Sequence, residues 1–248
     1  MIRVAICDFD MRHRKHIKDV CEKCLEVLNV EYQIKQYSSG EEMLSEEYPE
    51  MLILGVKLRR ISGIGLKEIL EHMNVETKIV FVAENRNHMA EAFGRNVYGF
   101  LNYPIKEKAF YEIVERMVRD IQYQTQKVFC YRDGTVHTIY FKDVVYIEVA
   151  GRKTKVFAKK DKDQIEEFLV DKTLKNWEEV LPEDVFVRGN RRQLLNLKYV
   201  VDINRQVTLI NHITISIGNV YRNQIRERMN EYQSRRKRVY GNSTTSNK

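Results

Sequence analysis

The chain has 248 residues, of which 43% are hydrophobic, 10% aromatic and 31% charged. This composition excludes collagen-like and mostly disordered chains, and the length favours two domains. The longest unbroken apolar run covers residues 79–83, far short of the roughly 20 residues that a membrane-spanning helix needs. The N-terminus lacks a signal-like apolar segment, so we expect a cytoplasmic protein whose four cysteines remain thiols.

The formal net charge of +7 lies in the second half of the chain. Residues 1–121 carry 18 Lys and Arg against 20 Asp and Glu, whereas residues 122–248 carry 24 against 15. A basic excess is typical of proteins that bind a polyanion such as a nucleic acid, although a solvated basic surface gives the same count. The charge therefore assigns any polyanionic partner to the second half.

In the first half, short apolar runs alternate with amphipathic stretches. The runs have the length and the β-branched or aromatic content of strands, and they cover residues 2–7, 32–37, 51–56, 78–83 and 98–101. Helical spacing joins Ile17, Val20, Cys21, Cys24, Leu25 and Leu28 on one face, and helices are also expected over residues 63–73, 87–94 and 106–123.

Ser39 and Glu42 have the spacing of a capping box that opens another helix. Strands followed by helices predict a doubly wound parallel α/β sheet over residues 1–121. In such sheets the functional site lies at the carboxyl ends of the strands. The loops after Cys7, Val56 and Ala83 are therefore the candidates.

The polar residues 122–128 predict a linker, which is followed by a mainly β domain over residues 129–238 and a disordered tail over residues 239–248. Asp133-Gly134 is a hairpin turn signal within that β domain. The expected strands cover residues 128–131, 135–141, 144–149, 153–158, 165–170, 185–188, 206–210 and 213–217, and the expected helices cover residues 173–181 and 219–238.

Short motifs follow one another along the first half in a fixed order: Ile6-Cys7-Asp8, Leu54-Gly55-Val56, Gly63, Glu91-Ala92-Phe93 and Tyr103-Pro104-Ile105. In this order they resemble a receiver domain of a response regulator, which implies a flavodoxin-like fold. The resemblance also implies a site of acidic Mg²⁺ ligands, an acceptor aspartate, a lysine and a Ser or Thr, because phosphoryl transfer depends on charge neutralisation.

Most of that chemistry is missing from this chain. The position of the acceptor aspartate is Gly55, and no aspartate occurs between residues 20 and 119. The other positions of the site hold Asp8 and Phe9 (the acidic pair), Ala83 (the Ser or Thr) and Tyr103 (the lysine). We therefore expect a degenerate receiver that binds no metal ion and is not phosphorylated on aspartate.

These replacements have two explanations. The domain is retained for dimerisation while its site drifts, with Tyr103 beside Phe9 filling the space of the lost acids. Alternatively, the replaced residues shape a small pocket or a permanently active-like surface. The sequence leaves both open.

A second ordered set of motifs runs through the other half: residues 144–148, Gly151 to Lys155, Thr173-Leu174, Phe186-Val187-Arg188, Leu195-Asn196 and Ile215-Ser216-Ile217. This set resembles a LytTR DNA-binding domain. The two domains stand in the order typical of LytTR response regulators, which are bacterial transcription factors. The resemblance implies double-stranded DNA as a partner and a homodimer or heterodimer formed through the receiver-like domain.

The resemblance implies DNA contacts after Phe-x-Arg, where this chain has Asn190, Arg191 and Arg192, and after the last hairpin, where it has Asn219. Arg can bridge guanine and Asn can bridge adenine, so Asn190, Arg191 and Asn219 suit base reading. Two of the arginines have an alternative explanation without DNA: Arg188 is a structural residue of the domain, and Arg192 is a solvated surface charge. The candidate phosphate contacts are Arg188, Arg192, Lys153 and Lys155.

Other patterns are weaker. Cys21 and Cys24 have a redox or zinc spacing but lie on the apolar helix face, where core packing explains them. Asp8-Phe9-Asp10 imitates a phosphatase nucleophile motif whose remaining parts are missing. We therefore expect a DNA-binding transcription regulator without enzymatic activity, cofactor or metal. The alternative is an interaction module that dimerises with another regulator and titrates it.

Overall fold

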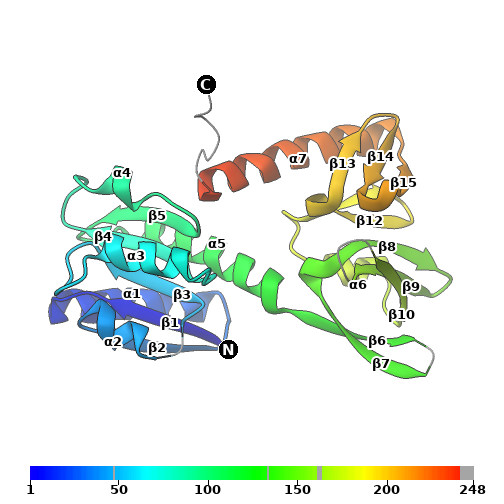
Figure 1. Cartoon of the computed structure of the whole chain (residues 1–248). Coiled ribbons are helices and arrows are strands. Elements are labelled where there is room, and N and C mark those ends of the chain that lie inside the picture. Colours follow the sequence, from blue (N-terminus) through cyan, green and yellow to red (C-terminus); the bar gives the residue numbers. More distant parts are fainter. Residues whose placement is uncertain (47, 133, 161–163, 241–248) are drawn as a thin grey trace. The chain divides into compact units, whose positions relative to one another are not determined.

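The computed structural model describes residues 1–46, 48–132, 134–160 and 164–240 (Figure 1). The chain forms two compact units, residues 1–121 and residues 122–235. Helix α5 (Glu107–Thr125) continues past this boundary, and strand β6 (Lys127–Arg132) begins directly after it. The segment expected as a linker, residues 122–128, therefore consists of the end of α5 and the start of β6. Its polar residues are compatible with a helix, and the side chain of Tyr123 is buried in the second unit.

The first unit is a parallel sheet of five strands in the order β2-β1-β3-β4-β5. This is the strand order of doubly wound, flavodoxin-like folds, and it confirms the predicted fold class. Its elements are β1 (Ile2–Cys7), α1 (Met11–Val27), β2 (Tyr32–Tyr37), α2 (Gly40–Leu44), β3 (Met51–Gly55), α3 (Gly63–His72), β4 (Lys78–Ala83), α4 (Met89–Ala92), β5 (Val97–Asn102) and α5.

Alternate residues of the five strands enter two separate cores. On one face, α1 and α5 pack their apolar stripes, including Leu25 and Phe110, against Ile53. On the other face, α2, α3 and α4 pack against Leu54 (Figure 1). Cys21 and Cys24 lie in the first of these cores, as their place on the helix face predicted.

Two local expectations need correction. Ser39 caps α2 by accepting a hydrogen bond from the Glu42 amide, but the Glu42 carboxylate accepts from Ser38 N at 2.9 Å, so the capping box is not reciprocal. Helix α4 is shorter than the expected 87–94 and ends before Phe93, whose backbone is extended.

The second unit is mainly β, as predicted. Its strands are β6, β7 (Thr135–Tyr140), β8 (Val144–Ala150), β9 (Lys153–Lys159), β10 (Ile165–Val170), β11 (Phe186–Asn190), β12 (Gln193–Asn196), β13 (Val200–Ile203), β14 (Gln206–Leu209) and β15 (Thr214–Ser216). Its helices are α6 (Leu174–Glu178), α7 (Asn219–Tyr240) and the short 3-10 helices η1 (Phe141–Asp143), η2 (Leu197–Tyr199) and η3 (Ile210–His212).

An antiparallel sheet in the order β11-β12-β8-β9-β10-β6-β7 forms the centre of this unit. One face packs on α6, whose Trp177 is fully buried and donates from Nε1 to Thr154 Oγ1 at 2.9 Å. The other face packs on the sheet β13-β14-β15 and on Ile225 and Met229 of α7.

Strands β12 and β13, of four residues each, were missed in the sequence. Helix α7 extends to Tyr240, so the start of the expected tail is helical, and residues 241–248 lie outside the described residues. Asn211 and His212 both have positive φ, which suits the tight turn expected between β14 and β15. Among the helices described, none combines the length and apolarity needed to cross a membrane.

Candidate nucleic-acid interface and strand-end site

The carboxyl ends of β1, β3, β4 and β5 surround a pocket in the first unit. The loops after Cys7, Val56 and Ala83 all contribute to it, as the doubly wound fold predicted. The lining includes Asp8, Phe9, His13, Val56, Ala83 and Tyr103. The structure therefore brings together the predicted residues Asp8, Phe9, Ala83 and Tyr103, and Gly55 lies directly beside Asp8.

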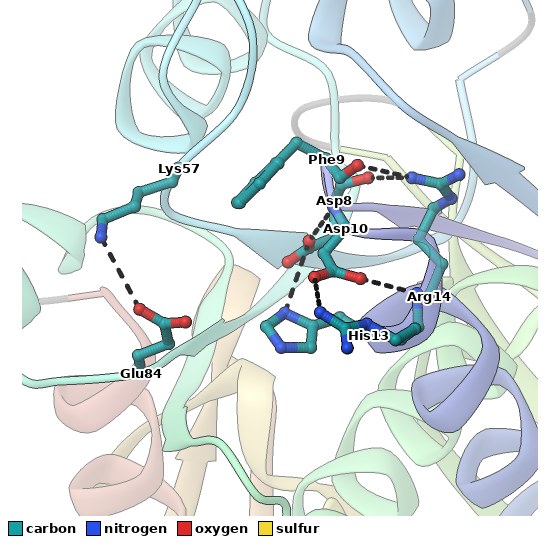
Figure 2. A network of polar contacts seen from close by, with 8 residues as sticks. Asp8, Phe9, Asp10, His13, Arg14, Lys57 and Glu84 are labelled. Atoms are coloured by element: carbon teal, nitrogen blue, oxygen red, sulfur yellow. Dashed lines mark hydrogen bonds and ion pairs between the residues drawn. The ribbon is translucent and has the colours of Figure 1, made fainter.

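The Asp8 carboxylate occupies the space that a side chain at position 55 would need. A Cβ added to Gly55 would lie 2.4 Å from Asp8 Oδ2. Asp8 is buried, and loss of solvent raises the pKa of its carboxyl above the ordinary value. Asp8 Oδ1 accepts from the Asp10 amide at 2.8 Å and lies 3.6 Å from His13 Nδ1 (Figure 2).

The second remaining acid does not join Asp8 in a cluster. Asp10 is the N-cap of α1 and accepts from the Arg12 amide at 2.7 Å. Figure 2 shows the Arg14 guanidinium on the backbone of the strand end, where it donates to Asp8 O at 2.6 Å. One buried carboxylate is less than the set of oxygen ligands that Mg²⁺ selects.

Tyr103 and Phe9 line the same pocket, but the ring contacts of Tyr103 are with two histidines of α1. Its ring lies 4.1 Å from the His13 ring and makes an edge contact with His16 at 5.6 Å. Phe9 remains 45% exposed at the rim of the pocket. The helical turn of α1 places His13 and His16 on the side that faces Tyr103. The strand motifs in the sequence give no sign of this contact.

We expect treatment with acetyl phosphate and Mg²⁺ to add no acid-labile phosphate to the chain, because position 55 has no acceptor and Asp8 fills its space. Intact-mass spectrometry measures this directly. The variant Gly55→Asp is the control. It supplies an acceptor, but Tyr103 still stands at the position of the lysine and Ala83 at the position of the Ser or Thr, so this variant too should stay unmodified. A mass increase of one phosphoryl group in the unaltered chain, removed by hydroxylamine, contradicts the expectation.

The predicted DNA-contacting residues gather at one end of the seven-stranded sheet. Asn190 ends β11, and Arg191 and Arg192 form the turn into β12. Asn190 Oδ1 accepts from the Arg192 amide at 2.8 Å, and the Val149 amide donates to Arg192 O at 2.9 Å. This turn is therefore held at both sides by hydrogen bonds, while the side chain of Arg191 is exposed.

Two further segments lie next to this turn. The β15–α7 junction is joined to it because Asn190 Nδ2 donates to Ser216 O at 3.0 Å, and exposed Asn219 opens α7. The β8–β9 turn adjoins it because Gln193 pairs with Glu148, close to the end of β8. The two segments that the family resemblance named are thus neighbours in space.

We define the basic end of the sheet as these three segments: the β11–β12 turn, the β8–β9 turn and the β15–α7 junction.

Several predicted residues have partners within the unit. Arg188 makes a paired contact with Glu178, with Nε to Oε1 at 2.6 Å and Nη2 to Oε2 at 2.7 Å, and this hydrogen-bonded carboxylate raises the pKa of Arg188. Arg188 therefore fits the alternative in which it is a structural residue of the domain and not a phosphate contact. Lys155 contacts Glu167 at 2.8 Å, and Lys153 lies 3.9 Å from Asp171. These are exposed pairs that solvent screens.

Arg152 was not among the candidate residues named from the sequence. This residue is exposed and follows Gly151, whose φ of 66° forms the β8–β9 turn. A glycine among the three residues between the predicted strands 144–149 and 153–158 is a hairpin signal that could have singled it out. By contrast, Arg222 and Arg226 of α7 donate to the carbonyls of Arg205 and Ile203.

We expect Asn190→Ala to lower the free energy of unfolding of the second unit by about 1–2 kcal/mol, because its amide connects the turn to Gln193, Ser216 and Arg192. DNA affinity should fall with it. Asn190→Asp keeps the Oδ1 acceptor but loses both donors, so its loss should be intermediate. Urea unfolding followed by the fluorescence of Trp177 measures the change. Unaltered stability with a complete loss of sequence preference would instead make Asn190 a base-reading residue.

Parts of the chain, and nearly its whole length, resemble known proteins. A family model described as "LytTr DNA-binding domain" matches residues 134–230. The sensory transduction protein LytT of Enterococcus faecalis is 20% identical over 245 residues, which cover 92% of this chain and 99% of that protein. The transcriptional regulatory protein NatR of Bacillus subtilis is 21% identical over 61% of this chain and 64% of that protein.

Two solved structures are also similar to this chain over part of its length. A LytTr DNA-binding domain of a putative methyl-accepting/DNA response regulator from Bacillus cereus covers 42% of this chain and 97% of that structure, at 20% identity and a TM-score of 0.38. The structure "BeF3 Activated DrrB Receiver Domain" covers 48% of this chain and 97% of its own, at 20% identity and a TM-score of 0.40.

Proposed function

We propose that this chain, a LytTR DNA-binding transcription regulator of the response-regulator type, holds duplex DNA at the basic end of its seven-stranded sheet without being switched by phosphorylation. The observation that carries the proposal is the meeting of three exposed segments at that end. Asn190 donates a hydrogen bond to Ser216 O, and the Val149 amide donates one to Arg192 O. A regulator of this kind works on chromosomal DNA in the cytoplasm.

The roles at the basic end follow from exposure and from existing contacts. Arg191 and Asn219 are exposed, so they are free to reach base edges. Arg152 and Arg192 contact phosphates, and Lys153 adds a weaker contribution. Asn190 and Arg188 position the turn, because their polar groups already contact other residues of the unit.

Lys155 is a weaker candidate for a phosphate contact than the sequence alone indicates. Its ammonium lies 2.8 Å from Glu167, which raises the pKa of the lysine and offsets its charge. A phosphate that approached Lys155 would have to compete with that carboxylate or accept its repulsion. We keep Lys155 as a secondary phosphate contact, behind Arg152 and Arg192.

The receiver-like unit serves assembly or partner contact. What supports this is the state of the strand-end site: Asp8 fills the acceptor space, Asp10 caps a helix, and the Tyr103 ring packs at a tilt against the His13 ring. A phosphorylation switch has no acceptor there, whereas the two cores of the unit are fully packed. The fold is therefore preserved although the chemistry is lost, which fits a homodimeric or heterodimeric contact.

The second candidate is an interaction module that binds another regulator through the receiver-like unit and withholds it from DNA. It shares the degenerate site, and it predicts that contacts with DNA are weak and independent of sequence. The two functions differ in what the basic end does.

Salt dependence tests the proposed phosphate contacts. Arg152→Gln combined with Arg192→Gln should weaken binding to every duplex and lower the slope of log affinity against log salt by roughly two counterions. The matched control removes two exposed charges from the first unit, Arg59→Gln and Arg95→Gln, and should leave the slope unchanged. Fluorescence anisotropy of the full chain at several salt concentrations gives the slope. Equal slopes for both double variants would move the DNA contact away from the basic end.

A further inference from the structure

The pocket at the carboxyl ends of β1, β3, β4 and β5 is small. Its cavity volume is about 30 Å³. A cavity needs roughly 10–15 Å³ to hold one water molecule, so this pocket admits a group of about the size of two water molecules. Ligands of doubly wound folds bind at this edge of the sheet. We call it the strand-end pocket, and its lining decides which chemical group it suits.

The Asp8 carboxylate lines the strand-end pocket and keeps one oxygen available. The side chain of Asp8 is 7% exposed. Its Oδ1 accepts a hydrogen bond from the Asp10 amide at 2.8 Å and lies 3.6 Å from His13 Nδ1. Among the residues that the structure describes, none donates a hydrogen bond to Asp8 Oδ2. Because a buried charge is unfavourable unless it is paired, this oxygen is suited to a donor that comes from a ligand.

The strongest cations around the pocket are engaged elsewhere. The Arg14 guanidinium donates to the carbonyl oxygens of Asp8 and Phe9, at 2.6 Å and 3.2 Å, and not to the carboxylate. Lys57 lies 3.7 Å from Glu84, and both of these side chains are exposed. Loss of solvent raises the pKa of the Asp8 carboxyl, which is the effect of burial without a close cation. The carboxylate therefore gains from a cation that enters the pocket.

Rings and aliphatic groups form much of the remaining lining. The rings of Tyr103 and His13 lie 4.1 Å apart and form one wall. Phe9 is 45% exposed at the mouth, and Figure 2 shows it across the Asp8 carboxylate from His13. Aromatic rings attract cations that lie within about 6 Å of the ring centre. Aliphatic side chains also line the pocket, from Val56, Val82 and Ala83.

Other classes of ligand fit this lining less well. An anion such as phosphate meets the buried Asp8 carboxylate, and like charges repel. A divalent metal ion selects a set of oxygen ligands, whereas the pocket offers one buried carboxylate. A neutral ligand leaves that carboxylate without a counter-charge. A quaternary ammonium has no N–H donor and is larger than the cavity, so the primary ammonium group fits best.

We propose that the strand-end pocket binds the ammonium group of a small primary amine. The ammonium group donates to Asp8 Oδ2 and lies against the rings of Tyr103 and Phe9. The alkyl chain of the amine contacts Ala83 and leaves through the mouth beside Phe9. An ammonium and a carboxylate form a charge-assisted hydrogen bond, which is stronger than a bond between neutral groups.

This inference goes beyond the proposed function, because it assigns a ligand to the first unit. It does not rest on DNA binding or on receiver contact. Failure of amine binding leaves the DNA contacts at the basic end of the sheet standing, and loss of DNA binding leaves the amine site standing.

A ligand series on the unaltered full chain tests the proposal. n-Butylammonium and tetramethylammonium are isomers with the same charge, but only the first has N–H donors and a narrow head. 1-Butanol has a similar length and no charge. Titration at constant ionic strength, followed by the amide NMR signals of Ala83 and Tyr103, gives the affinities.

The affinity for n-butylammonium should exceed that for either comparison compound by about tenfold or more. Because the ligand is small, we expect its Kd in the millimolar range. No saturable binding of n-butylammonium overturns the proposal. Equal affinities for the two isomers, or for n-butylammonium and 1-butanol, overturn it as well.

Asp8→Asn removes the charge of the carboxylate but keeps its shape and one acceptor oxygen. It should weaken n-butylammonium binding by about tenfold or more, which corresponds to about 1.4 kcal/mol. Asp10→Asn is the matched control, because Asp10 accepts the Arg12 amide outside the described lining and asparagine is an equally good N-cap. This control should keep the affinity of the unaltered chain. Equal weakening by both substitutions overturns the proposal, because general negative charge would then attract the amine.

Ala83→Leu tests the place of binding. The larger side chain fills the cavity without a change of charge, so n-butylammonium binding should be lost. Ala90→Leu, at an exposed position of α4, should leave the affinity unchanged. Circular dichroism confirms that the variants fold, and the ligand series on the unaltered chain decides the question for any that does not. Unchanged affinity of Ala83→Leu overturns the proposal.

Discussion

Replacing Arg191 by alanine should cost about 1–3 kcal/mol of binding free energy on the preferred DNA site and relax the preference at one base pair. The physical reason is the position of the residue. Its side chain is exposed at the tip of the β11–β12 turn, whose backbone is held by Arg188 and Asn190. A guanidinium on a fixed turn can bridge the acceptors of guanine at a small entropic cost.

The control for Arg191→Ala is Arg95→Ala, which removes the same charge from an exposed position in the first unit. Fluorescence anisotropy with the preferred duplex and a scrambled duplex separates the two roles of an arginine. Base reading predicts a loss that is large on the preferred site and small on the scrambled one. A loss of equal size on both duplexes means that the turn only holds the backbone.

Asn196→Ala should lower the free energy of unfolding of the second unit by about 2–4 kcal/mol. Asn196 is fully buried. Its Nδ2 donates to Val144 O at 2.7 Å and to Tyr123 Oη at 3.1 Å, and its Oδ1 accepts from the Lys198 amide at 3.0 Å. The alanine leaves these buried groups without their partner and opens a cavity.

Trp177 is the single tryptophan of the chain and lies buried in the second unit, so its fluorescence during urea unfolding reports on that unit. Tyr123→Phe removes one of the three bonds and should cost about 1 kcal/mol. Asn204→Ala, in an exposed turn, is the matched control and should change stability by about 0.5 kcal/mol or less. If Asn196→Ala leaves the urea midpoint of unfolding unchanged, the result contradicts this account of the core.

Strands β1, β3 and β4 of the first unit were predictable because they are buried on both faces and read as continuous apolar runs, whereas β2 was predictable from its aromatic and β-branched residues. The predicted bounds of β1, β2 and β4 agree with the structure. The linker was not predictable from polarity, since the tyrosine and glutamine residues after Ile121 continue a helix whose burial depends on the second unit. Short strands such as β12 are defined by pairing with distant strands, which local patterns do not contain.

The candidate site shows the same limit. The residue types around Arg191 and the loss of the acceptor at Gly55 were visible in the sequence. The partners were not: Glu178 binds Arg188, Glu167 contacts Lys155, and the His13 ring packs at a tilt against the Tyr103 ring. Each partner comes from a separate element, so only the fold decides which cations are available to DNA.

The most direct test of the central claim is the ratio of affinities of the untreated full chain for its best genomic site and for a scrambled duplex, at physiological salt. A sequence-specific regulator that needs no phosphorylation should prefer its site by about a thousandfold or more, with the same ratio after acetyl phosphate and Mg²⁺ are added. Equal affinities for the two duplexes would contradict the account and favour the titrating interaction module. A preference that appears only after acetyl phosphate treatment would contradict the loss of the phosphorylation switch.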